Sequence, residues 1–154
     1  MPMSPLVLCN NILRRGYEDG VSISPMKLQK LLYYVSVEYS KATGQKLFSE
    51  DFYVWKYGPV MPVVYNYFKP YSGKEIKEYS KDASGNASAY DESSSAVLRR
   101  VLDRVWHDLG RLSAVAVSEM THKSDSGWCK AYFDSRDTIT LEDMKADMSY
   151  VREL

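Results

Sequence analysis

Two side chains of the sequence have the types that covalent catalysis uses. His122 and Cys129 lie seven positions apart, and a thiolate beside an imidazolium is an effective nucleophile. A hydrolase of this kind also needs donors aimed at a developing oxyanion, and no motif that would supply them is evident. We therefore expect a protein that is not an enzyme, in which His122 closes a helix end through a hydrogen bond or its charge. The hydrolase stays open as an alternative, which unchanged activity of a Cys129→Ser variant would exclude.

The soft and borderline metal ligands of the chain are few. They are His107, His122, Cys9 and Cys129, and their spacing matches no zinc module. Two cysteines so far apart in sequence do not indicate a disulfide framework, so we expect both to be reduced. The sequence predicts neither a metal nor any other cofactor.

A short aromatic segment offers binding chemistry instead. Trp55, Tyr57, Gly58 and Pro59 lie close together in sequence. Tryptophan and tyrosine combine a large contact area with a polar group and are enriched where partners dock, so this segment is a candidate exposed hot spot. The alternative is a buried turn, in which the Gly-Pro pair redirects the backbone and Trp55 packs on the preceding helix.

The chain has thirteen tyrosines, among them Tyr33, Tyr34 and Tyr65. This number exceeds what a core of this size usually needs, because each buried hydroxyl requires a hydrogen-bond partner. We expect some of them to line a binding surface. The alternative is a position at the edge of the core, with the hydroxyl groups in water.

Helical periodicity is the main signal in the elements that must position these residues. After Ser24-Pro25, which suits the start of a helix, apolar residues recur at three- and four-residue spacing, while Lys27 and Lys30 take other faces. The predicted helices run from Leu6 to a stop at Gly16, from Pro25 to a stop at Gly44, from Val60 to Phe68, from Val97 to a stop at Gly110, from Ser113 to about Met120, and from Thr140 toward Leu154.

Two of these helix starts carry further signals. Leu112 and Val117 are placed for a hydrophobic staple around the cap at Ser113. Thr140, with Asp143 three residues on, resembles a capping box with aspartate in place of glutamate. Both starts therefore have a local reason to form.

Two segments are not expected to be helical. Residues 51–57, rich in aromatic and β-branched types, form a short strand or an extended loop. Residues 81–95 lack an apolar period and predict a mobile loop. Neither side of that loop has enough residues for a core of its own, so we predict one domain over residues 1–154.

The expected fold is mainly α, a compact bundle of about five to seven helices with a short β element around residues 51–57.

Net charge and hydropathy limit the classes of partner that the protein is expected to have. Twenty basic and twenty acidic residues cancel, so no global positive field attracts nucleic acid. Basic pairs such as Arg14 and Arg15 have acidic neighbours such as Glu18, which indicates solvated helix faces. A DNA-binding repressor therefore has no support. No stretch approaches the ~18 apolar residues of a membrane span, and no signal peptide is evident, so we expect a cytoplasmic protein without a membrane partner.

Three short motifs occur in order along these elements. Residues 27–34 read KLQKLLYY, residues 52–60 read FYVWKYGPV, and Thr121-His122 is followed by Trp128 and Ala131. Together they resemble the SocA-like, or Panacea, antitoxin domain over roughly residues 6–133. Members of that family commonly have an acidic residue soon after Thr-His and a proline before the tryptophan, whereas this chain has Lys123, Asp125 and Gly127.

The resemblance implies a bacterial or phage antitoxin of a type II toxin–antitoxin system. Such a protein neutralises a cognate protein toxin, typically encoded by an adjacent gene, by direct protein–protein binding. The alternative that the family implies is a proteolytic adaptor, which delivers its bound toxin to a cellular protease. Because the family pairs one domain with toxins of unrelated folds, the toxin itself is not predicted. The partner-binding residues that we expect are Trp55, Tyr57, Gly58, Pro59, His122 and Trp128.

Overall fold

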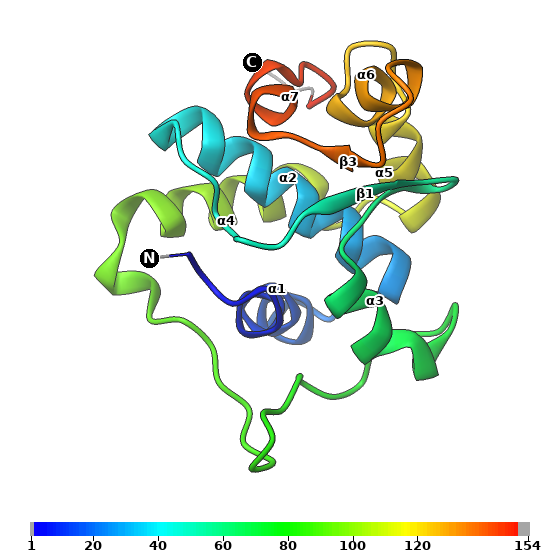
Figure 1. Ribbon diagram of the computed structural model, residues 1–154. Coiled ribbons are helices and arrows are strands. Elements are labelled where there is room, and N and C mark those ends of the chain that lie inside the picture. Colours follow the sequence, from blue (N-terminus) through cyan, green and yellow to red (C-terminus); the bar gives the residue numbers. More distant parts are fainter. Residues whose placement is uncertain (1, 151–154) are drawn as a thin grey trace.

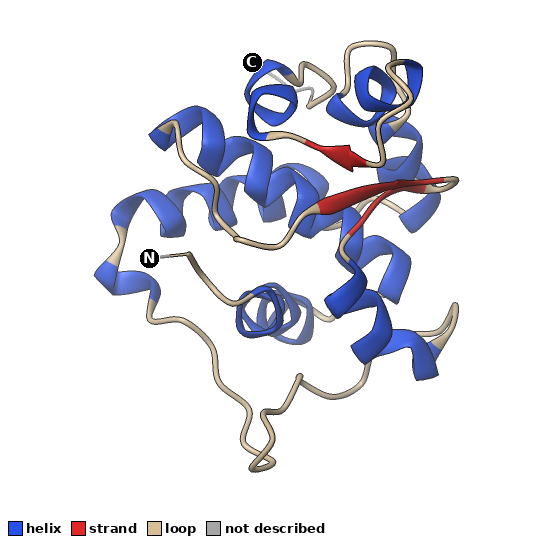
Figure 2. Ribbon diagram, viewed as in Figure 1, coloured by secondary structure: helices blue, strands red, loops and turns tan. Residues whose placement is uncertain are grey.

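Seven α-helices and one small antiparallel sheet are formed by residues 2–150, the part of the chain that the computed structural model describes (Figures 1 and 2). The mainly α fold with a short β element around residues 51–57 is confirmed. The helices are α1 (Pro5–Asp19), α2 (Pro25–Thr43), α3 (Pro62–Phe68), α4 (Ala96–Leu109), α5 (Ala114–Thr121), α6 (Gly127–Phe133) and α7 (Leu141–Ala146). The strands are β1 (Phe52–Trp55), β2 (Gly58–Val60) and β3 (Thr138–Ile139), and two short 3-10 helices cover Lys69–Tyr71 and Glu92–Ser94.

Helix α2 crosses the middle of the molecule and contacts α1, α3, α4, α5, α7 and β2 (Figure 1). Leu28 and Leu32 of its apolar stripe lie in the core, as periodicity predicted. Lys27 and Lys30, on other faces, are buried as well, because neighbouring elements cover α2 on several sides. The Lys27 ammonium donates to the carbonyl of Gly110, where a cation complements the C-terminal dipole of α4.

The sheet consists of a hairpin with one added strand. β1 is central and runs antiparallel to both β2 and β3. Tyr53 lies opposite Val60 in β2 and Thr138 in β3. The hairpin reaches the right-hand edge of Figure 1, between α6 above and α3 below. β1 contacts α6 and β2 contacts α5, two helices that are distant from the hairpin in sequence.

The predicted caps are present. Ser24 accepts a hydrogen bond from the Lys27 amide, and Gly44 ends α2 in the left-handed conformation with φ 73°, which glycine adopts without steric cost. Thr140 and Asp143 form the reciprocal capping box at the start of α7. Each of these helix starts and stops was readable from local sequence.

The first helix is longer than predicted. Gly16, expected to end it, lies inside α1, and the helix ends at Gly20 with φ 67°. A Cβ on Gly16 would lie 2.7 Å from Ile23 Cδ1. A larger residue at position 16 would clash with the segment that follows the helix, so glycine is required there for packing. It does not end the helix.

The last helix is shorter than predicted. It ends at Ala146, and Asp147 has extended backbone with φ −64° and ψ 119°. The Asp147 carboxylate accepts hydrogen bonds from the Tyr33 hydroxyl (2.6 Å) and the Gly127 amide (2.8 Å). These buried contacts take the place of a further helical turn. The part of the predicted helix over residues 151–154 lies outside the described residues.

Helix α6 was not predicted. It begins after Ser126, whose hydroxyl accepts from the Cys129 amide at 3.0 Å, and it covers only seven residues, too few for a clear apolar period. The Gly127 amide donates to the Asp147 carboxylate. A proline at this position would have no N–H to make that bond.

The segment between α3 and α4 is anchored at several points. The Asn10 side chain binds the carbonyls of Ser80 (3.0 Å) and Ser88 (2.8 Å), and Arg15 binds Glu92. Residues 81–87, between the anchors at Ser80 and Ser88, are exposed. The mobility expected of residues 81–95 stays a prediction. No helix described within residues 2–150 combines the length and apolar character needed to cross a membrane.

Candidate functional site

The predicted aromatic segment forms the tip of the β1–β2 hairpin. Trp55 pairs with Gly58 across the turn, so Lys56 and Tyr57 are its two central residues. Gly58 has φ 113°, a conformation that side chains strongly disfavour. The sequence order Trp-Lys-Tyr-Gly-Pro thus places two large aromatic residues at a sharp reversal of the chain.

Side chains from α5, α6 and the turn between them bind the backbone carbonyls of this tip. The bonds join the Trp128 indole nitrogen to the oxygen of Trp55 (2.8 Å), the His122 ring to the oxygen of Lys56 (3.0 Å), and the Ser118 hydroxyl to the oxygen of Tyr57 (2.7 Å). Three successive carbonyls therefore have partners from a separate part of the chain. The Thr-His and Trp128 motif of the sequence serves to fix the backbone of the aromatic motif.

Helix α2 holds the next part of the hairpin. Lys30 Nζ donates to the carbonyl of Pro59 at 3.0 Å. Gln29 makes two hydrogen bonds with the backbone of Met61, accepting from its amide (2.9 Å) and donating to its carbonyl (3.1 Å). A Cβ on Gly58 would lie 2.9 Å from Lys30 Cε. The first motif thus supports the second, and the buried-turn interpretation is confirmed for Gly58 and Pro59.

His122 is the residue at which α5 ends, as expected. One ring nitrogen faces the carbonyl of Ser118 (2.8 Å) and the other faces that of Lys56 (3.0 Å). Both carbonyls are acceptors, so each ring nitrogen already has a backbone partner. Neither nitrogen is free to act as a base toward Cys129, so this geometry gives the hydrolase alternative no support.

Trp55 and Tyr57 point outward from the fixed hairpin. Their exposed fractions are 38% and 63%. Trp55 packs edge-on against Tyr65 of α3, with ring centroids 5.0 Å apart, and the Lys56 ammonium lies 5.5 Å from the centre of the Tyr57 ring. The exposure that a hot spot needs is therefore present at these two residues, whereas Gly58 and Pro59 lie beneath the surface.

Trp128 connects the hairpin to aromatic residues that the sequence reasoning missed. It is buried, packs against His122 and stacks on Tyr132 with centroids 5.2 Å apart. Tyr132 and the adjacent Phe133 are 57% and 77% exposed. A Trp-x-x-x-Tyr-Phe spacing on a helix would have indicated this face, but α6 itself was not predicted.

Two of the tyrosines, Tyr33 and Tyr34, occupy neither of the two expected settings. Tyr33 and Tyr34 are buried in the core, and their hydroxyls bind Asp147 and Ser149 at 2.6 and 2.7 Å. Burial and the nearby Asp147 carboxylate raise the pKa of the Tyr33 hydroxyl well above its usual value. Tyr57 and Tyr65, by contrast, lie at the surface beside the hairpin.

A cavity of about 440 Å³ opens beside the hairpin, between β2, α2 and α3; we call it the hairpin cavity. Its walls are mostly apolar or aromatic, with a buried amine in one wall. The lining residues are Pro25, Met26, Gln29, Lys30, Trp55, Tyr57, Val60, Val64, Tyr65, Phe68, Lys69 and Ser72.

Lys30 is the unusual residue of the hairpin cavity. Its exposed fraction is 1%, and burial lowers the pKa of its ammonium to about 7. Within residues 2–150 it has no carboxylate partner. A buried cation normally has such a partner, so Lys30 has no counter-charge when it is protonated.

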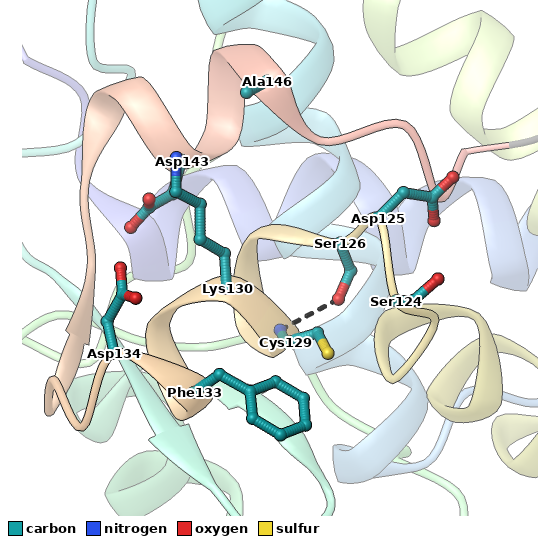
Figure 3. A pocket seen from close by; sticks show the side chains of 9 residues that line it. All are labelled: Ser124, Asp125, Ser126, Cys129, Lys130, Phe133, Asp134, Asp143 and Ala146. Carbon is teal, nitrogen blue, oxygen red and sulfur yellow. Dashed lines mark hydrogen bonds between the residues drawn. The ribbon is translucent and has the colours of Figure 1, made fainter.

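A second cavity, of about 340 Å³, lies between α6 and α7 (Figure 3). Cys129 and Phe133 form part of its wall, with Asp134 and Asp143 at one side. The Asp143 carboxylate is already held by Arg136 at 2.6 and 3.0 Å. Across residues 2–150, no group of three or more histidine, cysteine, aspartate or glutamate side chains is arranged to hold a metal ion.

Comparison with known proteins identifies the same family that the three motifs resemble. The family described as "Antitoxin SocA-like, Panacea domain" matches residues 28–129, a range that contains the hairpin and all the side chains that bind its carbonyls. "Antitoxin SocA" of Caulobacter vibrioides (strain NA1000 / CB15N) is 31% identical over 124 residues, which cover 79% of this chain and 66% of that protein. This chain thus spans just under two thirds of that relative. No solved structure matches.

Proposed function

Since this chain belongs to the SocA-like Panacea antitoxin family, we propose that it is the antitoxin of a type II toxin–antitoxin pair and neutralises its toxin by binding it directly. The family implies a toxin partner. The proposal that the chain acts by direct binding rests on the structure of the hairpin.

The observation that supports direct binding is the contrast within the hairpin between fixed backbone and exposed side chains. Trp128, His122 and Ser118 hold three carbonyls of the tip, while Trp55 and Tyr57 face outward. A surface that is already ordered loses little conformational entropy when a partner binds. Tryptophan and tyrosine are also the residues that most often dominate binding energy.

The expected partner-binding residues then divide into two roles. Trp55 and Tyr57 contact the toxin, and Gly58, Pro59, His122 and Trp128 hold the hairpin in position, the last two through their hydrogen bonds. The exposed pair Tyr132 and Phe133, reached from the hairpin through the stacked Trp128 ring, extends the contact surface. Catalysis has no part in this proposal.

The test is rescue of growth in bacteria that express the toxin from the adjacent gene. The chain is co-expressed as wild type, as the Trp55→Ala/Tyr57→Ala double variant, and as Met148→Ala, which removes an equally exposed apolar side chain elsewhere. We expect wild type and Met148→Ala to rescue growth and to co-purify with the toxin. The double variant should fold normally and lose at least ~100-fold in affinity, about 2.7 kcal/mol.

Toxin abundance separates direct neutralisation from delivery to a protease. In rescued cells the toxin should persist as a stoichiometric complex, also in a strain that lacks the cytosolic proteases. Rescue that requires a protease and removes the toxin would show that direct neutralisation is wrong. Full binding by the double variant would instead show that the hairpin is not the contact surface.

A further inference from the structure

The hairpin cavity is an apolar pocket with an excess of positive charge. Its volume of about 440 Å³ lies within the range of ~300–1,000 Å³ typical of ligand pockets. Met26, Val60, Val64 and Phe68 supply the apolar wall, which favours an aliphatic or aromatic group. A single large side chain of a protein partner fits such a space.

The charges around the cavity are all of one sign. Lys30 and Lys69 line it, and no aspartate or glutamate does. Lys69 is exposed at the rim, with its ammonium 6.0 Å from the centre of the Tyr65 ring. Lys56 lies beside the neighbouring Tyr57 ring. An anionic group entering here would meet the Lys69 and Lys56 ammonium groups, and it would favour the protonated form of Lys30.

Lys30 also has unused hydrogen-bonding capacity. Its ammonium carries three N–H donors, and among residues 2–150 its hydrogen bond is the one to the Pro59 carbonyl. Desolvating a cation without a counter-charge is costly. A carboxylate brought into this wall would reduce that cost, so the charge complementarity favours an acidic occupant.

We propose that the hairpin cavity receives a segment of the toxin in which an apolar side chain lies next to a carboxylate. The apolar group packs against Val64 and Phe68, and the carboxylate approaches Lys30 and Lys69. The inference rests on the proposed function, because the toxin is the occupant. Trp55, Tyr57 and Tyr65 at the cavity mouth supply the surrounding aromatic contacts, as in interface hot spots built around an anchoring pocket.

The cavity can be tested without the toxin. The probe is 4-phenylbutyrate, which joins an aromatic ring to a carboxylate, and its counterpart is 4-phenylbutylamine, with the same ring and the opposite charge. Binding is followed by amide chemical shifts of Val64, Phe68 and Lys69. We expect the anion to shift these resonances and the cation to leave them unchanged. Equal binding of both probes would overturn the charge argument.

Two variants test the cavity in the complex. Met26→Trp fills the space, and Lys69→Glu reverses the rim charge; Lys77→Glu makes the same charge change at an exposed lysine outside the lining. We expect Lys69→Glu to weaken toxin binding about fivefold or more, Met26→Trp to weaken it further, and Lys77→Glu to match wild type. Thermal unfolding of each variant establishes that it is folded.

The outcomes separate this inference from the proposed function. A wild-type chain that neither binds the toxin nor rescues growth overturns the proposed function. A wild-type complex that Met26→Trp and Lys69→Glu leave unchanged overturns the cavity inference alone, and so does probe binding without any effect of these variants on the toxin. Weakening by Met26→Trp and Lys69→Glu, with Lys77→Glu unaffected, supports it.

Discussion

The indole nitrogen of Trp128 donates to the backbone carbonyl of Trp55 at 2.8 Å, across a sequence separation of 73 residues. Trp128 belongs to α6 and Trp55 to the tip of the hairpin, so this bond joins two motifs that the sequence shows only as neighbours in order. A partly buried carbonyl that loses its donor costs about 1–3 kcal/mol. The position of the hairpin therefore depends on a residue far from it in the chain.

Trp128→Phe should lower the free energy of unfolding by about 1–3 kcal/mol, because the Trp55 carbonyl loses its partner while an aromatic ring remains. Urea unfolding measures the loss. Phe133→Leu, at a neighbouring exposed position, is the control and should change stability by less than about 0.5 kcal/mol. Equal stability of the two variants would show that the bond does not hold the hairpin.

Gly58→Ala should be strongly destabilising. Gly58 has φ 113°, and a Cβ there would lie 2.6 Å from Thr121 Oγ1 and 2.9 Å from Lys30 Cε. Strain and overpacking together cost at least about 2 kcal/mol. Gly73→Ala is the matched control, because it has open space and an ordinary φ. Differential scanning calorimetry of both variants decides the matter, and a melting temperature for Gly58→Ala equal to that of Gly73→Ala would contradict the expectation.

Lys30 should make stability depend on pH above neutrality. Burial lowers its pKa from 10.5 to about 7, so between these values the unfolded chain binds a proton that the folded chain does not. Stability therefore rises as pH increases through this window, by up to about 1.4 kcal/mol per pH unit. The free energy of unfolding of wild type minus that of Lys30→Met should rise from pH 7 to pH 9. A constant difference would mean that Lys30 keeps an ordinary pKa.

Glu92 should contribute stability that acid removes. Its burial alone would raise its pKa, but hydrogen bonds from Arg15 and Asn11 and the nearby arginine charges outweigh this and lower the pKa to about 2. The contribution is full above the unfolded value of 4.5 and is lost as pH falls toward 2.

Glu92→Gln should accordingly cost roughly 2 kcal/mol at pH 7, after allowance for partial solvent screening, and much less near pH 2. Urea unfolding at both pH values measures this. Glu142→Gln, which changes a side chain that is 79% exposed, is the control and should be near neutral at both. A pH-independent effect of Glu92→Gln would contradict the ion-pair explanation.

The two cysteines should differ in reactivity in the folded protein. Cys9 is fully buried, and burial raises the pKa of its thiol. Cys129 is 7% exposed and lines the second cavity. A disulfide reagent such as DTNB should label Cys129 first, and Cys129→Ser should react only on unfolding. The same variant should rescue growth as wild type does, and its failure to do so would reopen a role for the thiol.

Local signals in the sequence were sufficient for the helices that have them. Ser24-Pro25, Gly44 and the Thr140–Asp143 pair fix helix ends through hydrogen bonds within a few residues, and such bonds are readable from spacing. The prediction failed at Gly16, where glycine leaves room for the close approach of Ile23 and does not end the helix. It also failed after Ala146, where Asp147 binds the Tyr33 hydroxyl instead of continuing the helix. It also failed for α6, which is too short to show a period.

Sequence and tertiary structure also contributed different information about the candidate site. The sequence by itself indicated an aromatic segment with a Gly-Pro change of direction at Trp55, Tyr57, Gly58 and Pro59, and it left open whether this segment is an exposed hot spot or a buried turn. The tertiary structure decided which of the four residues face solvent. Hydrogen bonds from side chains of α2, α5 and α6 hold the hairpin so that Gly58 and Pro59 are buried, while Trp55 and Tyr57 are exposed.

The uncompensated charge of Lys30 was equally beyond sequence reasoning. A lysine on a helix is ordinarily solvated, and Lys30 is buried because the hairpin and other elements pack around α2. Sequence indicated most of the helices and the family, since these depend on short-range spacing and on the order of motifs. The tertiary structure decided the exposed surface and the charged cavity, because both are made where segments distant in the chain meet.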